Sequence, residues 1–263
     1  MKKERRKFKL SPLGIYAVLA YSFLYLPLAV VIVFSFSPTK SIVGFSGFTT
    51  RWYIKLFNDE ALIAALIHSL QVSLTAVSIA VVIGTSGAFF LVRANFPGKQ
   101  LFRSLSQLPL ILPGIILGIA LLILFMNLGF ELSMFSILMG HVCFTTPVIM
   151  FQVASRLQRL PRSFEYAAKD LGATPVKIFW YVTLPMIRTA IIGGALLAFT
   201  MSFDEIIITY FLTGTWTTLP VFIYGMMRFG LSPQVFAIST VVLTFAMVLI
   251  VLMAKFTAVR EEL

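Results

Sequence analysis

Two adjacent acidic residues, Asp204 and Glu205, lie within an apolar stretch of the sequence. Charged side chains inside a membrane span are costly and usually face a cavity or a partner. Neighbouring residues of a helix point about 100° apart, so the two carboxylates cannot share one face. Glu205 lies on a stripe with Ser202, Thr209 and Thr213, at spacings of three and four residues. This stripe is the more polar one, and we expect it to face a solute pathway.

Carboxylates on such a pathway would attract a cation, because ammonium groups need carboxylates or aromatic faces. Two structural alternatives stay open. The acids could form an ion pair or hydrogen bond with a partner protein, or they could occupy the N-terminal position of a broken helix. The residues predicted for a substrate pathway are Asp204, Glu205, Ser202 and Thr209.

The sequence carries no recognisable set of catalytic or ATP-binding residues. The phosphate-binding pattern G-x-x-x-x-G-K-[ST] is absent, and the Gly98–Lys99 pair lacks the first glycine. His68 and His141 are far apart in sequence and lie near or within apolar stretches, so we interpret both as packing or hydrogen-bonding residues. We therefore predict that the chain is not an enzyme, and we expect neither catalytic nor metal-binding residues in it.

The composition is that of a protein whose solvent is lipid. Hydrophobic residues make up 59% of the 263 residues and charged residues 12%, against about 25% charged residues in an ordinary soluble domain. Cys143 is the one cysteine, so no disulfide can form within the chain. The net charge of +11 fits Lys and Arg gathered in cytoplasmic loops better than it fits binding to nucleic acid.

Apolar stretches of spanning length predict an all-α integral membrane protein with six transmembrane helices in one domain, residues 1–263. A helix needs about 20 apolar residues to cross the hydrocarbon. Interior glycines and prolines do not exclude a span, because neighbouring helices re-satisfy the freed backbone groups. The basic start of the chain leads directly into the first stretch, as in a retained first helix. The expected spans are residues 13–36, 67–92, 104–126, 133–155, 189–212 and 235–255.

The basic residues predict the orientation of these spans. With the N-terminus inside, all but four of the 21 Lys and Arg residues fall in inner segments. The exceptions are Lys40, Arg51, Lys55 and Arg228. Such an excess marks the cytoplasmic side, so we expect both termini in the cytoplasm.

Two outer segments are expected to have structure of their own. Residues 44–66 place Trp52, Tyr53, Leu56 and Phe57 at helical spacing, which favours a short helix at the outer interface. Residues 213–233 are apolar but broken by glycine and proline, which favours a re-entrant or cap segment.

Residues 156–188 form a charged segment that cannot cross a bilayer. A helix is expected from about Pro161 to Leu171, because proline suits a first turn and Gly172 suits the left-handed residue that ends a helix. Thr174 can then cap a second helix that has a proline at its first position. On spacing alone, a solvated connecting loop remains an alternative to a docking site.

This second helix should end before Pro185. A proline removes a backbone donor and disfavours helical geometry in the residue before it.

The same segment resembles the EAA motif of binding-protein-dependent ABC importer permeases. In that motif EAA is followed by three residues, Gly, nine residues, Ile, one residue and Leu-Pro. Val182 stands in place of the isoleucine, and Tyr166 stands at the glutamate position with Glu165 one residue earlier. The resemblance implies a coupling helix that sits in a groove of an ATPase subunit. The coupling residues would be Glu165, Ala167, Ala168, Asp170, Gly172, Leu184 and Pro185.

The resemblance extends over most of the chain. The stretches GFTTRWY, KLFND, AFTMSFDEIIITYFLTG, LPVFIY and GLSPQVFAISTVVL are similar to the second, C-type permease subunit of the spermidine/putrescine importer family. This implies a MetI-like permease fold with a cytoplasmic coupling loop, in a bacterial inner membrane, with a polyamine as substrate moved inward by alternating access. It also implies a second homologous permease, two ATPase subunits that bind ATP and Mg, and an extracytoplasmic substrate-binding protein.

Three other functions are alternatives to polyamine import. A related permease could carry another small solute, such as iron, an opine or a phosphonate, because the coupling motif says nothing about cargo. A secondary transporter driven by an ion gradient would lack the EAA segment and often shows an inverted repeat, which is not visible here. A non-transporting membrane anchor would not explain acidic residues within a span.

Overall fold

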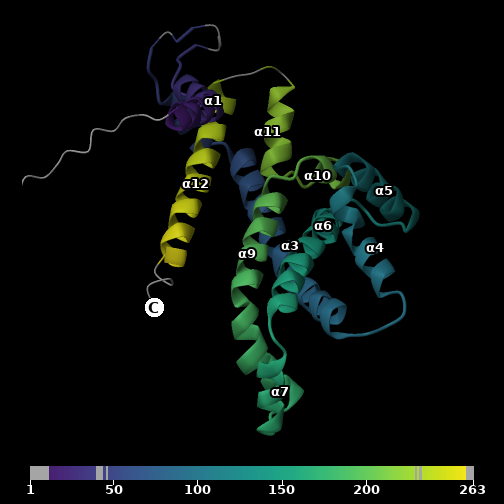
Figure 1. Cartoon of the computed structure of the whole chain (residues 1–263). Helices are drawn as coiled ribbons and strands as arrows, with labels where there is room; N and C mark the ends of the chain where they lie inside the picture. The colour runs from purple at the N-terminus through teal and green to yellow at the C-terminus, as the bar shows by residue number, and fades with distance from the viewer. Residues whose placement is uncertain (1–11, 40–43, 46, 229, 231–232, 259–263) are drawn as a thin grey trace, which may run out of the picture. The chain divides into compact units, whose positions relative to one another are not determined.

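The computed structural model describes residues 12–39, 44–45, 47–228, 230 and 233–258, and the regular secondary structure within these ranges is all helix (Figure 1). The predicted all-α class is therefore confirmed. The described residues divide into two compact units, one from residues 1–60 and 225–263 and the other from residues 61–224. The basic start of the chain and parts of the segments 44–66 and 213–233 lie outside the described residues.

Three helices form the unit that contains the two ends of the described chain. They are α1 (Pro12–Phe34), α2 (Arg51–Phe57) and α12 (Pro233–Ala258). The short helix expected within residues 44–66 is present as α2, and α12 packs against both other helices. Trp52 is buried and its indole Nε1 donates to the Ser37 carbonyl oxygen at 2.8 Å. None of the 23 residues of α1 is buried within the chain, which suits a helix surrounded by lipid or by a partner.

The other unit begins with four helices that precede the charged segment in the chain. They are α3 (Glu60–Arg93), α4 (Lys99–Ile111), α5 (Gly114–Asn127) and α6 (Met134–Arg159). After them come α7 (Ser163–Asp170), α8 (Pro175–Ile178), the π-helical turn η1 (Phe179–Thr183), α9 (Leu184–Phe203), α10 (Ile207–Leu212) and α11 (Leu219–Met227).

The core of this unit lies where α3 and α9 pack against α6, as Figure 1 shows for α6 and α9. One face of α3 carries small residues four apart, which lets two backbones approach closely without a hydrophobic driving force from water. These are Ala76, Ala80, Gly84 and Ala88. A Cβ atom added at Gly84 would lie 2.8 Å from the Thr146 carbonyl oxygen of α6. This glycine therefore sets the spacing between α3 and α6.

The structure supports the six expected spans in part. Four helices of the described chain are long and apolar enough to cross a membrane, and a bent pair could supply a fifth. The four are α1, α3, α6 and the continuous helix Pro175–Phe203. Within α12, the stretch Pro233–Val248 is apolar but shorter.

The span expected over residues 104–126 is not one straight helix. It divides into α4 and α5, whose axes are bent by 104°. Leu112, which precedes Pro113, takes an extended conformation with ψ 137°. The proline ring disfavours helical geometry at the residue before it, and proline has no N–H to continue the ladder. The prolines within α1, α4 and α6 leave those helices unbroken.

The expectation that a helix would end before Pro185 was wrong. The helix that starts at Pro175 runs on through η1 into α9. The Leu184 N–H bonds to the Phe179 carbonyl, five residues back, instead of the usual four. This wider π turn places the register change directly before Pro185, where the missing N–H and the ring would otherwise disturb an α-helix.

We predict that Gly84→Ala lowers the stability of the protein by about 1–3 kcal/mol, because the new Cβ would press on backbone atoms of α6 that cannot rotate away. Thermal unfolding of the purified protein in detergent measures this. Gly193→Ala in α9 is the matched control, since its Cβ meets nothing within 4 Å and should stabilise the helix by up to about 1 kcal/mol. Equal melting temperatures for the two variants would contradict the close α3–α6 contact.

Candidate functional site

The chain breaks its helix at the two acidic residues. α9 ends at Phe203, and α10 begins at Ile207. Asp204 caps the end of α9 with a non-helical backbone (φ −97°, ψ 5°) and its side chain is exposed. Glu205 is half-buried, and its Oε1 accepts a hydrogen bond from the Ile208 N–H at 2.9 Å. The helix is therefore broken at the acidic pair, and Glu205 lies at the N-terminus of its second part.

The predicted Glu205 stripe does not exist, because it assumed a continuous helix. Ser202 and Thr209 are buried, 2% and 0% exposed, and do not share an open face with Glu205. Thr213 turns its hydroxyl to the carbonyl oxygen of Trp216. The acidic side chains and the hydroxyl groups thus lie near the same break. The carboxylates are at least partly exposed, whereas the hydroxyls of Ser202 and Thr209 are buried.

His141 of α6 joins the two sides of this break. Its Nδ1 lies 2.7 Å from the Ser202 Oγ at the end of α9, and its Nε2 lies 2.8 Å from the Thr209 Oγ1 in α10. The Thr209 hydroxyl donates onward to the Glu205 carbonyl oxygen at 3.1 Å. Because a hydroxyl has one proton, this network places the imidazole proton on Nε2 and makes Nδ1 the acceptor for Ser202. The interpretation of His141 as a hydrogen-bonding residue is confirmed.

The partners of His141 could not be predicted from the sequence, because they lie 61 and 68 residues away from it. The signal in the sequence was a polar ring within a mostly apolar stretch. A buried imidazole must find hydrogen-bond partners, so this ring indicated that partners exist without identifying them. His68 behaves similarly: its ring stacks on Trp216 with centroids 3.9 Å apart, and its Nδ1 lies 3.1 Å from the Thr217 carbonyl oxygen.

Helices α5 and α6 support α10 from the side. A Cβ at Gly118 of α5 would lie 2.9 Å from Phe211, and one at Gly140 of α6 would lie 2.5 Å from Leu212. Leu212 and Ile208 are almost fully buried in the cluster that these contacts form. The short α10 is therefore held by close packing as well as by His141.

The charged segment 156–188 folds locally as its sequence predicts. Helix α7 ends at a left-handed Gly172 (φ +82°). The Gly172 N–H bonds to the Lys169 carbonyl at 2.9 Å and the Ala173 N–H to the Ala168 carbonyl at 3.0 Å, the pattern of a Schellman cap. The Thr174 hydroxyl caps α8 by accepting from the Lys177 N–H, and Pro175 occupies the first turn.

Glu165 is half-buried and pairs with a residue of the same chain. Its Oε1 forms an ion pair with the Arg93 guanidinium at the end of α3, at 2.7 Å. The Thr183 hydroxyl donates to the same oxygen at 3.4 Å. Sequence reasoning missed Arg93, because 72 residues separate it from its partner.

The other predicted coupling residues lie on or near the surface of this segment. Ala167, Asp170 and Gly172 are exposed, and Ala168 is half-buried. Leu184 is half-buried and Pro185 exposed in the first turn of α9. The exposed face of α7 that ends at Leu171, 89% exposed, is therefore open to another protein.

The part of the chain that the structure describes offers no metal centre: no three His, Cys, Asp or Glu side chains gather there. The two carboxylates at the helix break, one exposed and one half-buried, carry the negative charge that attracts a cation.

The chain is similar to proteins of a known transport family. Residues 79–259 match the family described as "Binding-protein-dependent transport system inner membrane component". The chain is 39% identical over 234 residues to the putrescine transport system permease protein PotI of Escherichia coli K12, covering 86% of this chain and 83% of that protein. It is 36% identical over 232 residues to the spermidine/putrescine transport system permease protein PotC of the same strain, covering 88% of each chain.

Solved structures share the fold at much lower identity. A chain of a bacterial ABC transporter involved in the import of the acidic polysaccharide alginate superposes with a TM-score of 0.70 at 16% identity, covering 92% of this chain and 94% of that one. A chain of an amino acid ABC transporter with histidines gives a TM-score of 0.59 at 17% identity, covering 79% of this chain and 100% of that one. By its sequence match and these relatives, the chain belongs to the family of binding-protein-dependent transport system inner membrane components.

Proposed function

We propose that this chain is the C-type permease subunit of an ATP-driven importer of polyamines, putrescine or spermidine, in a bacterial inner membrane. Family membership makes it a transport subunit and not an enzyme. The names of its relatives support a polyamine cargo. The observation that carries the proposal is the pair of carboxylates at a helix break that is fixed by a buried histidine.

The two carboxylates differ in exposure, and together they could bind the two ammonium groups of a diamine. Asp204 is exposed and can meet an ammonium group as it enters. Glu205 is half-buried, its Oε1 holds the Ile208 N–H, and no described residue pairs with its Oε2. That second oxygen can accept from a cation without losing the cap of α10. Charge-assisted bonds of this kind are stronger than bonds between neutral groups.

In this proposal, the ATPase subunits drive transport by moving the charged segment, residues 156–188. The exposed face of α7 docks on one of two ATPase subunits, which bind ATP and Mg, with both termini and residues 156–188 in the cytoplasm. The Arg93–Glu165 pair then links movement of α7 to α3, and the continuous helix from Pro175 to Phe203 links it to the break at Asp204. Alternating access of six spans, shared with a second permease, would carry cargo from an external binding protein inward.

The chief alternative keeps the permease and changes the cargo to another small solute, such as iron, an opine or a phosphonate. The acidic pair favours a cation over an anion such as a phosphonate. A secondary transporter driven by an ion gradient is a poor fit to a family that depends on binding proteins.

We predict that Glu205→Gln lowers putrescine uptake by about fivefold, because replacing a charge-assisted bond by a neutral one costs about 1 kcal/mol. Glutamine keeps an acceptor for the Ile208 N–H, so the complex should still assemble. Initial rates of labelled putrescine uptake measure the effect. Glu131→Gln, an exposed acid before α6, is the matched control and should leave uptake unchanged. Equal uptake in both variants would remove Glu205 from the pathway.

We predict that Gly172→Val separates or uncouples the ATPase, because a β-branched residue strongly resists a φ of +82°. The site has open space around it, so the effect is on the backbone and not on packing. Co-purification of the ATPase with the permease and substrate-stimulated ATP hydrolysis are the measurements. Gly172→Asn, which tolerates this conformation better, should retain most of both. A fully active valine variant would contradict the role of this turn.

A further inference from the structure

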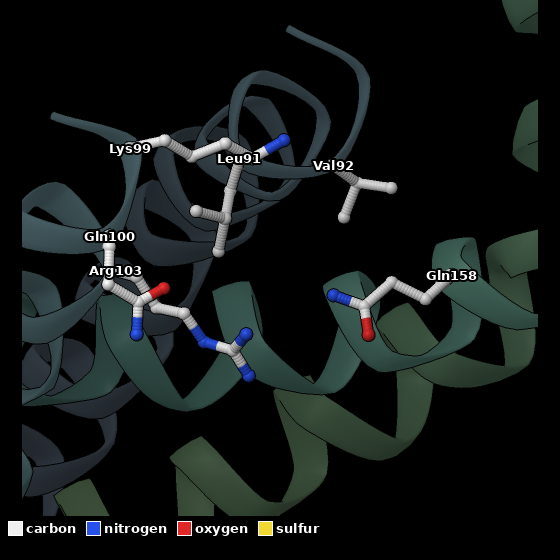
Figure 2. A pocket seen from close by; sticks show the side chains of 6 residues that line it. All are labelled: Leu91, Val92, Lys99, Gln100, Arg103 and Gln158. Carbon is white, nitrogen blue, oxygen red and sulfur yellow. The ribbon is translucent and has the colours of Figure 1, made fainter. Parts of the chain in front are cut away.

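A basic pocket lies where three helices of the larger unit begin or end (Figure 2). It has a volume of about 430 Å³ between the end of α3, the start of α4 and the end of α6. Figure 2 shows the Arg103 guanidinium and the Gln158 amide pointing toward each other across it. The lining residues are Leu91, Val92, Lys99, Gln100, Arg103 and Gln158.

The charges of this pocket are unbalanced. Two cations and two amides line it, and none of its lining residues is acidic. The Lys99 ammonium donates to the Ala94 carbonyl at 2.9 Å, which leaves its other protons available. No described side chain pairs with the Arg103 guanidinium. A ligand with an anionic oxygen group would supply the acceptors that these donors lack.

The helix that supplies both cations is also strongly amphipathic. On α4, Gln100 and Arg103 lie on one side, and an exposed stripe of leucines runs alongside. Leu101, Leu105 and Leu108 are 63%, 54% and 43% exposed. A basic helix with such a stripe is typical of the boundary between lipid headgroups and acyl chains. The pocket and the stripe together fit an amphiphile with an anionic head and apolar tails.

We propose that this pocket binds the headgroup of an anionic phospholipid, such as phosphatidylglycerol, with its acyl chains along the Leu101–Leu105 stripe. Basic pockets between membrane helices are suited to such headgroups, because each Lys or Arg near an anionic surface adds about a fivefold preference. The assignment rests on the chain being a membrane component and is independent of its cargo and of transport.

Lipid selectivity of the purified complete importer tests this proposal. The complex is stripped of lipid, offered equal amounts of phosphatidylglycerol and phosphatidylethanolamine, and its bound lipids are counted by native mass spectrometry. We expect preferential retention of phosphatidylglycerol, reduced about fivefold by Lys99→Gln or Arg103→Gln and about thirtyfold by the double variant. Arg188→Gln, an exposed cation on α9 that does not line the pocket, is the control and should keep the preference.

Two further arms separate other occupants. Millimolar inorganic phosphate that displaces the lipid as well as added phosphatidylglycerol does would overturn a lipid site in favour of a phosphate site. Leu101→Ser with Leu105→Ser should weaken lipid retention, because the acyl chains lose their apolar contact. Unchanged lipid selectivity in the Lys99 and Arg103 variants, together with loss of the ATPase on purification, would overturn the proposal and make the pocket a docking site for an acidic residue of the ATPase.

Discussion

The hydrogen bonds between the His141 ring and the hydroxyls of Ser202 and Thr209 are the interaction on which the arrangement of the candidate pathway depends. A helix broken inside a membrane protein frees backbone groups that water cannot reach, and side chains must satisfy them. His141 ties the end of α9 to α10, and Glu205 caps the N-terminus of α10. Each buried hydrogen bond is worth about 1 kcal/mol, and leaving a partner unsatisfied costs about 1–3 kcal/mol.

Glycine residues let the helices around this break pack closely against one another. Gly118 and Gly140 let α10 approach α5 and α6, while Gly84 brings α3 against α6. Such contacts use dispersion and close fit instead of a hydrophobic effect, which lipid does not supply between helices. At the other end of the unit, the ion pair between Arg93 and Glu165 joins α3 to α7. The helix from Pro175 to Phe203 then gives a continuous connection from the charged segment to the break.

Local sequence signals predicted local structure well. Gly172 and Thr174 define a turn through their own backbone and side-chain preferences, and both behave as expected. Leu112 and Pro113 show the limit of such reasoning, since Pro27 and Pro147 leave their helices intact while Pro113 marks a bend of 104°. Which proline bends a helix depends on packing that the sequence does not reveal.

Non-local contacts could not be predicted. The charge of Glu205 within an apolar stretch correctly indicated an unusual position in the fold. The prediction that Glu205 shares one helix face with Ser202 and Thr209 was wrong, because it assumed an unbroken helix. The partners of His141 and the Arg93–Glu165 pair lie 61 to 72 residues apart in sequence. The continuation of the helix through Pro185 depended on a π turn, a feature without a composition signal.

The most direct test is uptake of labelled putrescine and spermidine by proteoliposomes that contain the complete importer, with this chain as wild type or as His141→Leu. We expect ATP-dependent accumulation with the wild-type chain. With the assembled variant we expect a lower maximal rate, because His141 no longer holds the helix break at Asp204 and Glu205. Equal rates in the two would contradict the role of His141. An assembled wild-type complex that accumulates neither polyamine would contradict the proposed cargo.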